Sequence, residues 1–132
     1  ASTDGRNFAV SGGVAKAVVG VIKSQYPDRE VKVMNAEGLA DCKKMMTMAK
    51  AGKYPGYLLE GMACPGGCVG GGGQPVKDGY ELAFNRGKKL YFLDENSEIR
   101  YSHENKDIIA LYDEYFHKPL SHRAHELLHV HE

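Results

Sequence analysis

The spacing of apolar residues predicts helices that alternate with strands in the first half of the chain. An apolar run over 8–25 predicts a helix with Ser11 as its N-cap. Alternating, β-branched residues at 31–34 predict a short strand, helical spacing over 37–51 predicts a second helix, and an apolar run at 57–60 predicts a second strand. Because a helix connects the two strands, we expect them to pair in parallel with helices packed against them.

The C-terminal part of the chain predicts helices alone. Apolar residues at helical spacing predict helices over 78–92, 108–116 and 120–131. Gly87 weakens the first of these predictions, and Pro119 is expected in the first turn of the last helix. The expected fold class is therefore α/β, with short parallel strands flanked by helices, followed by an α-helical C-terminal tail.

Charge and hydropathy narrow the possible partners. Seventeen Lys plus Arg residues balance seventeen Asp plus Glu residues, so the chain lacks the basic surface that attracts nucleic acid or an anionic membrane. No apolar run is long enough to cross a bilayer, and the first residues do not form an export signal. We therefore expect no nucleic-acid partner, no membrane span and a cytoplasmic location, with a periplasmic location left open.

The candidate chemistry lies in a glycine-rich loop between Gly61 and Pro75. This loop follows the second predicted strand, and open α/β sheets bind ligands at the carboxyl ends of their strands. Cys64 and Cys68 are four positions apart in the loop, with Pro-Gly-Gly between them. That spacing lets two thiolates bind one iron–sulfur cluster, while the glycines let backbone amides approach its sulfides.

The spacing of the two cysteines alone leaves other kinds of site open. A structural zinc site or a disulfide remains possible, and an iron–sulfur cluster with four cysteine ligands cannot be completed within this sequence. The third cysteine, Cys42, lies on the apolar stripe of the second predicted helix and is interpreted as an ordinary packing residue. Two cluster ligands would then have to come from elsewhere.

Two stretches of the sequence at this loop, Glu60–Cys68 and Gly71–Pro75, are similar to the last of the three signature motifs of [FeFe] hydrogenases. The resemblance implies that Cys64 is a terminal ligand of the [4Fe–4S] half of the H-cluster. It implies that Cys68 bridges this cluster to a two-iron subsite that carries CO, cyanide and a dithiolate bridge. Met62 is then expected to pack beside the two-iron subsite and shield it from water.

The resemblance extends to both ends of the chain. The segment Phe8–Val14 resembles the family segment that passes the two-iron subsite, which implies that Phe8 is a cofactor-pocket residue. The family usually has glycine where Ala9 stands, which argues against a close backbone contact from position 9. Residues 101–129 resemble the small-subunit element of the family. We therefore expect 1–95 to belong to the catalytic domain and 96–132 to form a small-subunit-like tail.

Three histidines of the tail suggest a second possible metal site. His122, His125 and His129 fall on one face of the last predicted helix, which would suit zinc. No carboxylate or cysteine accompanies them in a fixed pattern, so they are interpreted as packing and capping groups.

The resemblance implies reversible reduction of two protons to H2, with Cys68 and Met62 as the catalytic residues. The other two signature motifs of the family are missing from these 132 residues. We therefore expect a fragment or one chain of a split enzyme, which needs a further segment or subunit and an electron donor such as ferredoxin. The alternatives are a hydrogenase-like iron–sulfur carrier or assembly protein, a non-catalytic redox sensor of the family, and a zinc-binding or interaction module.

Overall fold

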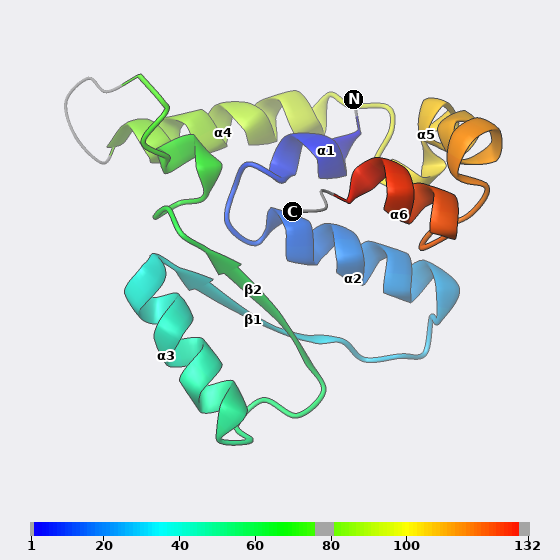
Figure 1. The fold of residues 1–132 in the computed structure, drawn as a ribbon. Coiled ribbons are helices and arrows are strands. Elements are labelled where there is room, and N and C mark those ends of the chain that lie inside the picture. Colours follow the sequence, from blue (N-terminus) through cyan, green and yellow to red (C-terminus); the bar gives the residue numbers. More distant parts are fainter. Residues whose placement is uncertain (1, 76–80, 130–132) are drawn as a thin grey trace.

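A computed structural model describes residues 2–75 and 81–129 of the chain (Figure 1). Its helices and strands are α1 (Thr3–Asn7), α2 (Gly13–Gln25), β1 (Lys32–Glu37), α3 (Leu39–Lys50), β2 (Tyr57–Met62), α4 (Glu81–Glu95), α5 (Lys106–Leu111) and α6 (His122–Leu128). Two 3-10 turns, η1 (Cys68–Gly70) and η2 (Ser102–Glu104), and one π-helical turn, η3 (Tyr112–Phe116), complete the described structure.

The two strands form a parallel pair, which confirms the fold class predicted from the sequence. Their register runs from Lys32 opposite Tyr57 to Glu37 opposite Met62. Helix α3 connects the strands and packs on both of them, while α2 contacts β2. Figure 1 shows α2 and α3 on opposite sides of the sheet. The carboxyl ends of both strands therefore lie at one edge, where the cysteine loop begins.

The prediction of Ser11 as the N-cap of α2 is wrong. The helix begins one residue later than that cap would require, with Gly12 in the left-handed region at φ 87°. The side chain of Glu60, on β2, accepts hydrogen bonds from Gly12 N at 2.5 Å and from Ala15 N at 3.1 Å. A carboxylate from a distant strand therefore satisfies the free amides at the start of α2.

The structure also corrects several element boundaries. Helix α1 was not predicted, because its five residues are mostly polar and carry no apolar period. The helix predicted over 108–116 ends at Leu111 and continues as the π-helical turn η3. Pro119 precedes α6, whose N-cap is Ser121 with its side chain accepting from Ala124 N at 3.0 Å. The predicted ends at 78–80 and 130–131 lie outside the described residues.

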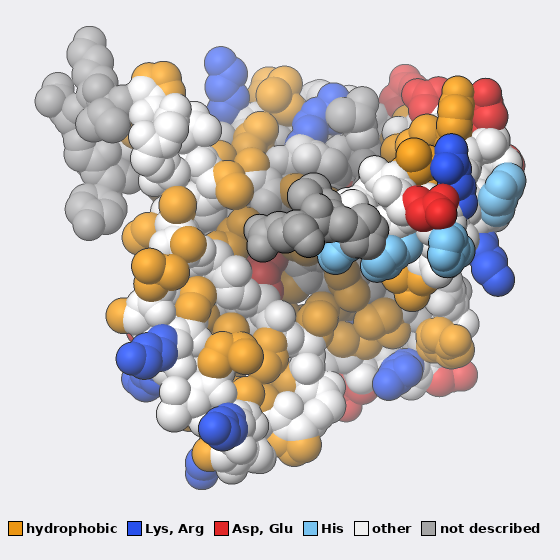
Figure 2. All heavy atoms as spheres, in the orientation of Figure 1, with side chains coloured by type: hydrophobic (Ala, Val, Ile, Leu, Met, Phe, Trp, Pro, Cys, Tyr) orange, Lys and Arg blue, Asp and Glu red, His pale blue; other side chains and the backbone are white. Residues whose placement is uncertain are grey.

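The buried apolar residues are mostly small, and many large apolar side chains are exposed. The buried set is Ala15, Ala17, Ala36, Met45, Val69, Phe116 and Ala124. Figure 2 shows hydrophobic side chains spread over the outer face of the molecule along α2 and over the sheet. Contiguous exposed apolar surface of this kind is typical of a region that other protein covers. None of the helices in 2–75 and 81–129 has the length and hydrophobicity that a bilayer crossing demands.

Candidate functional site

The cysteine loop lies where the sequence predicted it, directly after β2. Cys64 follows the strand by two residues and is half-buried, and Cys68 begins η1 and is exposed. Both thiols are free, as is that of Cys42. The loop therefore presents two unlinked thiols at the carboxyl edge of the sheet.

Successive turns curl the loop around its cysteines. Gly67 N donates to Cys64 O, Gly70 N donates to Gly67 O, and Gly71 N donates to Cys68 O, each at 3.0 Å. A Cβ atom at Gly70 would lie 2.2 Å from Pro65 O, a distance that no side chain could occupy. The tight curl therefore requires glycine at this position.

The segment that precedes α2 packs directly against the loop. Ser11 N donates to Gly66 O at 3.2 Å, and Val69 N donates to Ala9 O at 3.1 Å. A Cβ atom at Gly67, where φ is 93°, would lie 2.6 Å from Ser11 N. The Ala9 carbonyl therefore binds the loop itself, whereas the argument against a close backbone contact from position 9 with the two-iron subsite stays a prediction.

Glu37 anchors the loop and Glu60 anchors the start of α2 beside it, and neither was predicted as a functional residue. Glu37, the last residue of β1, accepts a hydrogen bond from Gly66 N at 2.9 Å. Glu60 is buried at the start of α2, as described above. The only sequence signal was the position of Glu60 four residues before Cys64, because all three of these hydrogen bonds join residues 29 or more positions apart.

The two expected pocket residues, Phe8 and Met62, stand at the ends of α1 and β2. Phe8 follows α1 as its C-cap and is exposed, and Met62 ends β2 and is half-buried. The Met62 carbonyl accepts a hydrogen bond from Gly38 N at 2.8 Å. Their roles beside a cofactor stay predictions, since the described contacts of both residues are with the chain itself.

Two protein families match different parts of the chain. Residues 1–72 match the family model described as the iron only hydrogenase large subunit, C-terminal domain. The chain belongs to this family. Residues 81–131 match a second model, described as the iron hydrogenase small subunit, and this match begins at the first residue of α4. The predicted division of the chain between residues 95 and 96 stays a prediction.

Similar proteins are much longer than this chain. It is 44% identical over 120 residues to the NADP-reducing hydrogenase subunit HndD of Solidesulfovibrio fructosivorans, covering 90% of this chain and 20% of that protein. It is 38% identical over 122 residues to iron hydrogenase 1 of Clostridium pasteurianum, covering 89% of this chain and again 20% of the relative. The chain thus spans about a fifth of the length of these two relatives.

A solved structure shares the fold. It is an [FeFe]-hydrogenase structure whose description concerns oxygen inactivation through degradation of the H cluster 2Fe subcluster. The TM-score is 0.63 at 48% sequence identity, and the match covers 76% of this chain and 24% of the solved chain. The hydrogenase fold predicted from the loop motif is therefore confirmed.

Cys42 stands apart from the cysteine pair of this hydrogenase loop. Its sulfur lies 3.6 Å from the carbonyl oxygens of Ala36 and Met62, at the ends of the two strands. A Cβ atom at Gly61 would lie 3.1 Å from the same sulfur. These contacts suit the packing role expected for Cys42.

The tail histidines are engaged with their neighbours. His122 Nδ1 lies 3.3 Å from a Glu126 carboxylate oxygen, and the rings of His125 and His129 stack with centroids 4.5 Å apart. Within 2–75 and 81–129, no three His, Cys, Asp or Glu side chains are grouped so that they could hold a metal ion. The interpretation of these histidines as packing and capping groups stays a prediction.

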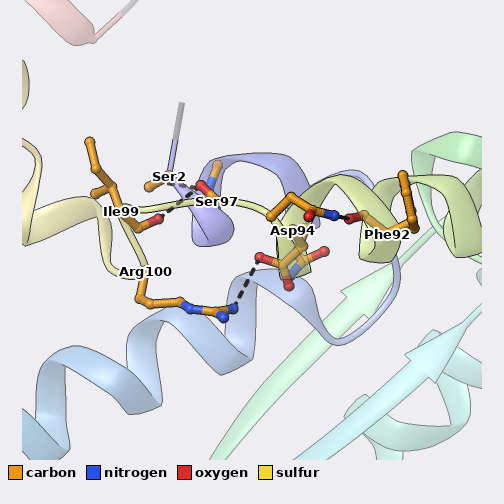
Figure 3. Close-up of polar contacts among 9 residues, drawn as sticks. Ser2, Phe92, Asp94, Ser97, Ile99 and Arg100 are labelled. Carbon is orange, nitrogen blue, oxygen red and sulfur yellow. Dashed lines mark hydrogen bonds and ion pairs between the residues drawn. The ribbon is translucent and has the colours of Figure 1, made fainter.

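A buried polar junction joins the two parts of the chain that match different hydrogenase models. Asn7 Nδ2 donates to Asp94 Oδ2 at 3.1 Å. Figure 3 shows Arg100 directed towards Asp94, with Arg100 Nη1 3.8 Å from Asp94 Oδ1. Burial raises the pKa of the Asp94 carboxyl, but the polar neighbours Thr3 and Asn7 and the charges of Arg100 and Lys16 together lower it below its ordinary value. Asp94 is therefore held ionised between α1, α4 and the tail.

Proposed function

We propose that this chain is the part of an [FeFe] hydrogenase that supplies Cys64 and Cys68 to the H-cluster. Cys64 is a terminal ligand of the [4Fe–4S] cluster, and Cys68 bridges that cluster to the two-iron subsite with its CO, cyanide and dithiolate ligands. One observation carries the proposal: two free thiols share a glycine loop at the carboxyl edge of the sheet, in a chain of this family.

The surroundings of the two thiols fit an iron–sulfur cluster. Cys68 is exposed and Cys64 is half-buried, so a cluster shared with other protein segments can reach both sulfurs. Glycine at position 71 leaves space next to one thiol, because a Cβ atom there would lie 3.6 Å from Cys64 Sγ. A glycine-rich backbone also lets amide groups approach the cluster sulfides and stabilise their negative charge.

The H-cluster, when bound, supplies the redox chemistry that interconverts two protons, two electrons and H2. The residues of this chain hold it and exclude solvent. Cys68 and Met62 are the proposed catalytic residues, because Cys68 links the two halves of the cofactor and Met62 packs beside the two-iron subsite. Phe8 is proposed to close the same pocket from the end of α1.

The proposal requires further protein. An iron–sulfur cubane takes four ligands, and this chain offers two from its loop, so another segment or subunit of the hydrogenase must supply the rest. An electron donor such as ferredoxin, a cytoplasmic location and the division into 1–95 and 96–132 belong to the same proposal. The length of the relatives supports the need for further protein, since the aligned region is about a fifth of each relative.

Infrared spectroscopy of the anaerobically assembled enzyme tests this function. We expect CO and cyanide stretching bands and H2 evolution in the wild type, and loss of both in Cys68→Ala. Cys42→Ala is the matched control, because its thiol packs against the strand ends, and it should keep the bands.

Three results would count against the proposed function. Zinc without labile sulfide would favour the zinc-binding module, and a cubane without CO and cyanide bands would favour an iron–sulfur carrier or assembly protein. Very slow turnover by an enzyme with a complete cofactor would favour a redox sensor.

A further inference from the structure

Helices α2 and α4 each contain an interior glycine, and the surroundings of these two glycines differ. Glycine is among the least favourable residues inside a helix, so an interior glycine calls for a packing reason. At Gly20 in α2 the reason is visible, because a Cβ atom would lie 3.1 Å from the ring of Tyr101. At Gly87 in α4, no heavy atom of the described residues lies within 4 Å of the Cβ position.

Gly87 forms part of a groove that runs along the cysteine loop. The groove has a volume of about 440 Å³ and is lined by the loop, by the segment before α2 and by α4. Pro65 and Gly66, which lie between the two cysteines, form one wall, and Phe84, Gly87 and Tyr91 of α4 form the other. A segment that occupies this groove must therefore lie against the loop that carries both thiols.

The two charged side chains at the groove, Glu37 and Lys88, already have partners within the chain. The Glu37 carboxylate accepts from Gly66 N at 2.9 Å, and the Lys88 ammonium lies 4.4 Å from the centre of the Phe84 ring. The remaining lining is largely apolar, with Val10, Val69 and Ala83 among its residues. The groove therefore suits a large apolar or aromatic side chain better than a charged ligand.

We propose that this groove is the docking site for the hydrogenase segment that carries the other cluster ligands. That segment inserts a large apolar or aromatic side chain over Gly87, as Tyr101 does over Gly20. Most of the length of the relatives lies outside the aligned region, and the missing ligands must approach the loop that forms the groove wall. The inference rests on the proposed function, because it takes its occupant from the need for those ligands.

Photo-crosslinking in the complete assembled enzyme tests the occupant. Benzoylphenylalanine replaces Phe84, which lines the groove, or Phe92, which does not line it but is on the same helix and is equally exposed at 65%. We expect position 84 to crosslink to a peptide of the segment with the other cysteine ligands, and position 92 not to do so. Crosslinks from position 84 to a second copy of the chain, to another protein or to nothing would overturn the docking site.

A blocking substitution tests the role of Gly87. Gly87→Leu adds a side chain at a position where no heavy atom of the described residues lies within 4 Å of the Cβ position, whereas the control Asn85→Leu adds the same side chain to an exposed position of α4 outside the groove. Relative to the wild type, we expect several-fold lower iron content per assembled enzyme and loss of the crosslink from benzoylphenylalanine at position 84. Both effects should occur in Gly87→Leu and not in the control. Equal iron content in both variants, with a loaded wild type, would overturn the docking site and leave the proposed function standing. A wild type without the H-cluster would instead defeat the proposed function.

Discussion

The cysteine loop and the turn between η3 and α6 both use left-handed backbone, but different residue types adopt it. In the loop, Gly66 and Gly67 have φ of 78° and 93°, whereas in the turn His117 and Leu120 have φ of 63° and 57°. Glycine adopts this conformation without steric cost, while other residues lose about 1–2 kcal/mol each. The loop is therefore relaxed where the turn of the tail is strained.

The neighbours of the two regions explain this difference. At Gly67 a Cβ atom would lie 2.6 Å from Ser11 N, so glycine is needed for contact with another segment. Leu120 is 100% exposed, and the turn is held instead by Ser121, whose hydroxyl donates to Phe116 O. We infer that changes in the loop affect the positions of the cysteines, whereas changes in the turn have local effects.

The largest expected effect comes from adding one methyl group to the loop. Gly70→Ala places a Cβ atom 2.2 Å from Pro65 O, which forces the backbone between the cysteines to shift. We expect loss of most of the bound iron and a fall of about 1–3 kcal/mol in the free energy of unfolding. Iron analysis and urea unfolding of the assembled enzyme measure these quantities.

Gly72→Ala is the control for this prediction, because no heavy atom of the described residues lies within 4 Å of its Cβ position and its φ is not positive. Its free energy of unfolding should change by less than about 0.5 kcal/mol. Equal iron loss in both variants would mean that the loop is generally intolerant of side chains and would remove the proposed reason for glycine at position 70.

The carboxylate that joins the loop strand to α2 should give the next largest effect. Glu60→Ala leaves Gly12 N and Ala15 N without their acceptor, and we expect a loss of about 1–2 kcal/mol in the free energy of unfolding. Glu60→Gln keeps an acceptor but removes the charge, so it should lose about half as much. Glu95→Ala at an exposed position is the control in the same urea titration. If Glu60→Ala matched the control, the capping role of Glu60 would be wrong.

The junction between the loop half and the tail should respond to acid. Because the pKa of Asp94 is lower in the folded state than in the unfolded state, its ionised carboxylate stabilises the fold above about pH 4, the ordinary aspartate value. This stabilisation is lost as the pH falls through the folded-state pKa. The stability difference between wild type and Asp94→Asn should therefore be constant near neutral pH and shrink below about pH 4.

Urea unfolding at a series of pH values measures this difference, with Asp28→Asn at an exposed position as the control. A difference between wild type and Asp94→Asn that grew towards acid would contradict the lowered pKa of Asp94.

Local signals predicted the elements and the cysteine loop, while contacts between distant residues were not predictable. The parallel strands and the position of Cys64 and Cys68 after β2 follow from apolar spacing and glycine density, which act over a few residues. The hydrogen bonds of Glu60 to the start of α2 join residues 45 and 48 positions apart. Glu60 therefore caps the helix in place of Ser11, which the local sequence predicted as the N-cap. Helix α1 was missed because its stability comes from buried polar contacts such as that of Asn7 with Asp94.

The smallest expected effect comes from the strained turn of the tail. Leu120→Gly relieves the left-handed strain and loses no buried contact, because the side chain is fully exposed. The greater entropy of glycine in the unfolded chain offsets part of the gain, so we expect a net stabilisation of about 0.5 kcal/mol. Lys118→Gly, in the same turn but without a positive φ, should instead lose about 0.5–1 kcal/mol. Thermal unfolding distinguishes the two, and equal destabilisation by both glycines would show that Leu120 is not strained and that the contrast between tail and loop is wrong.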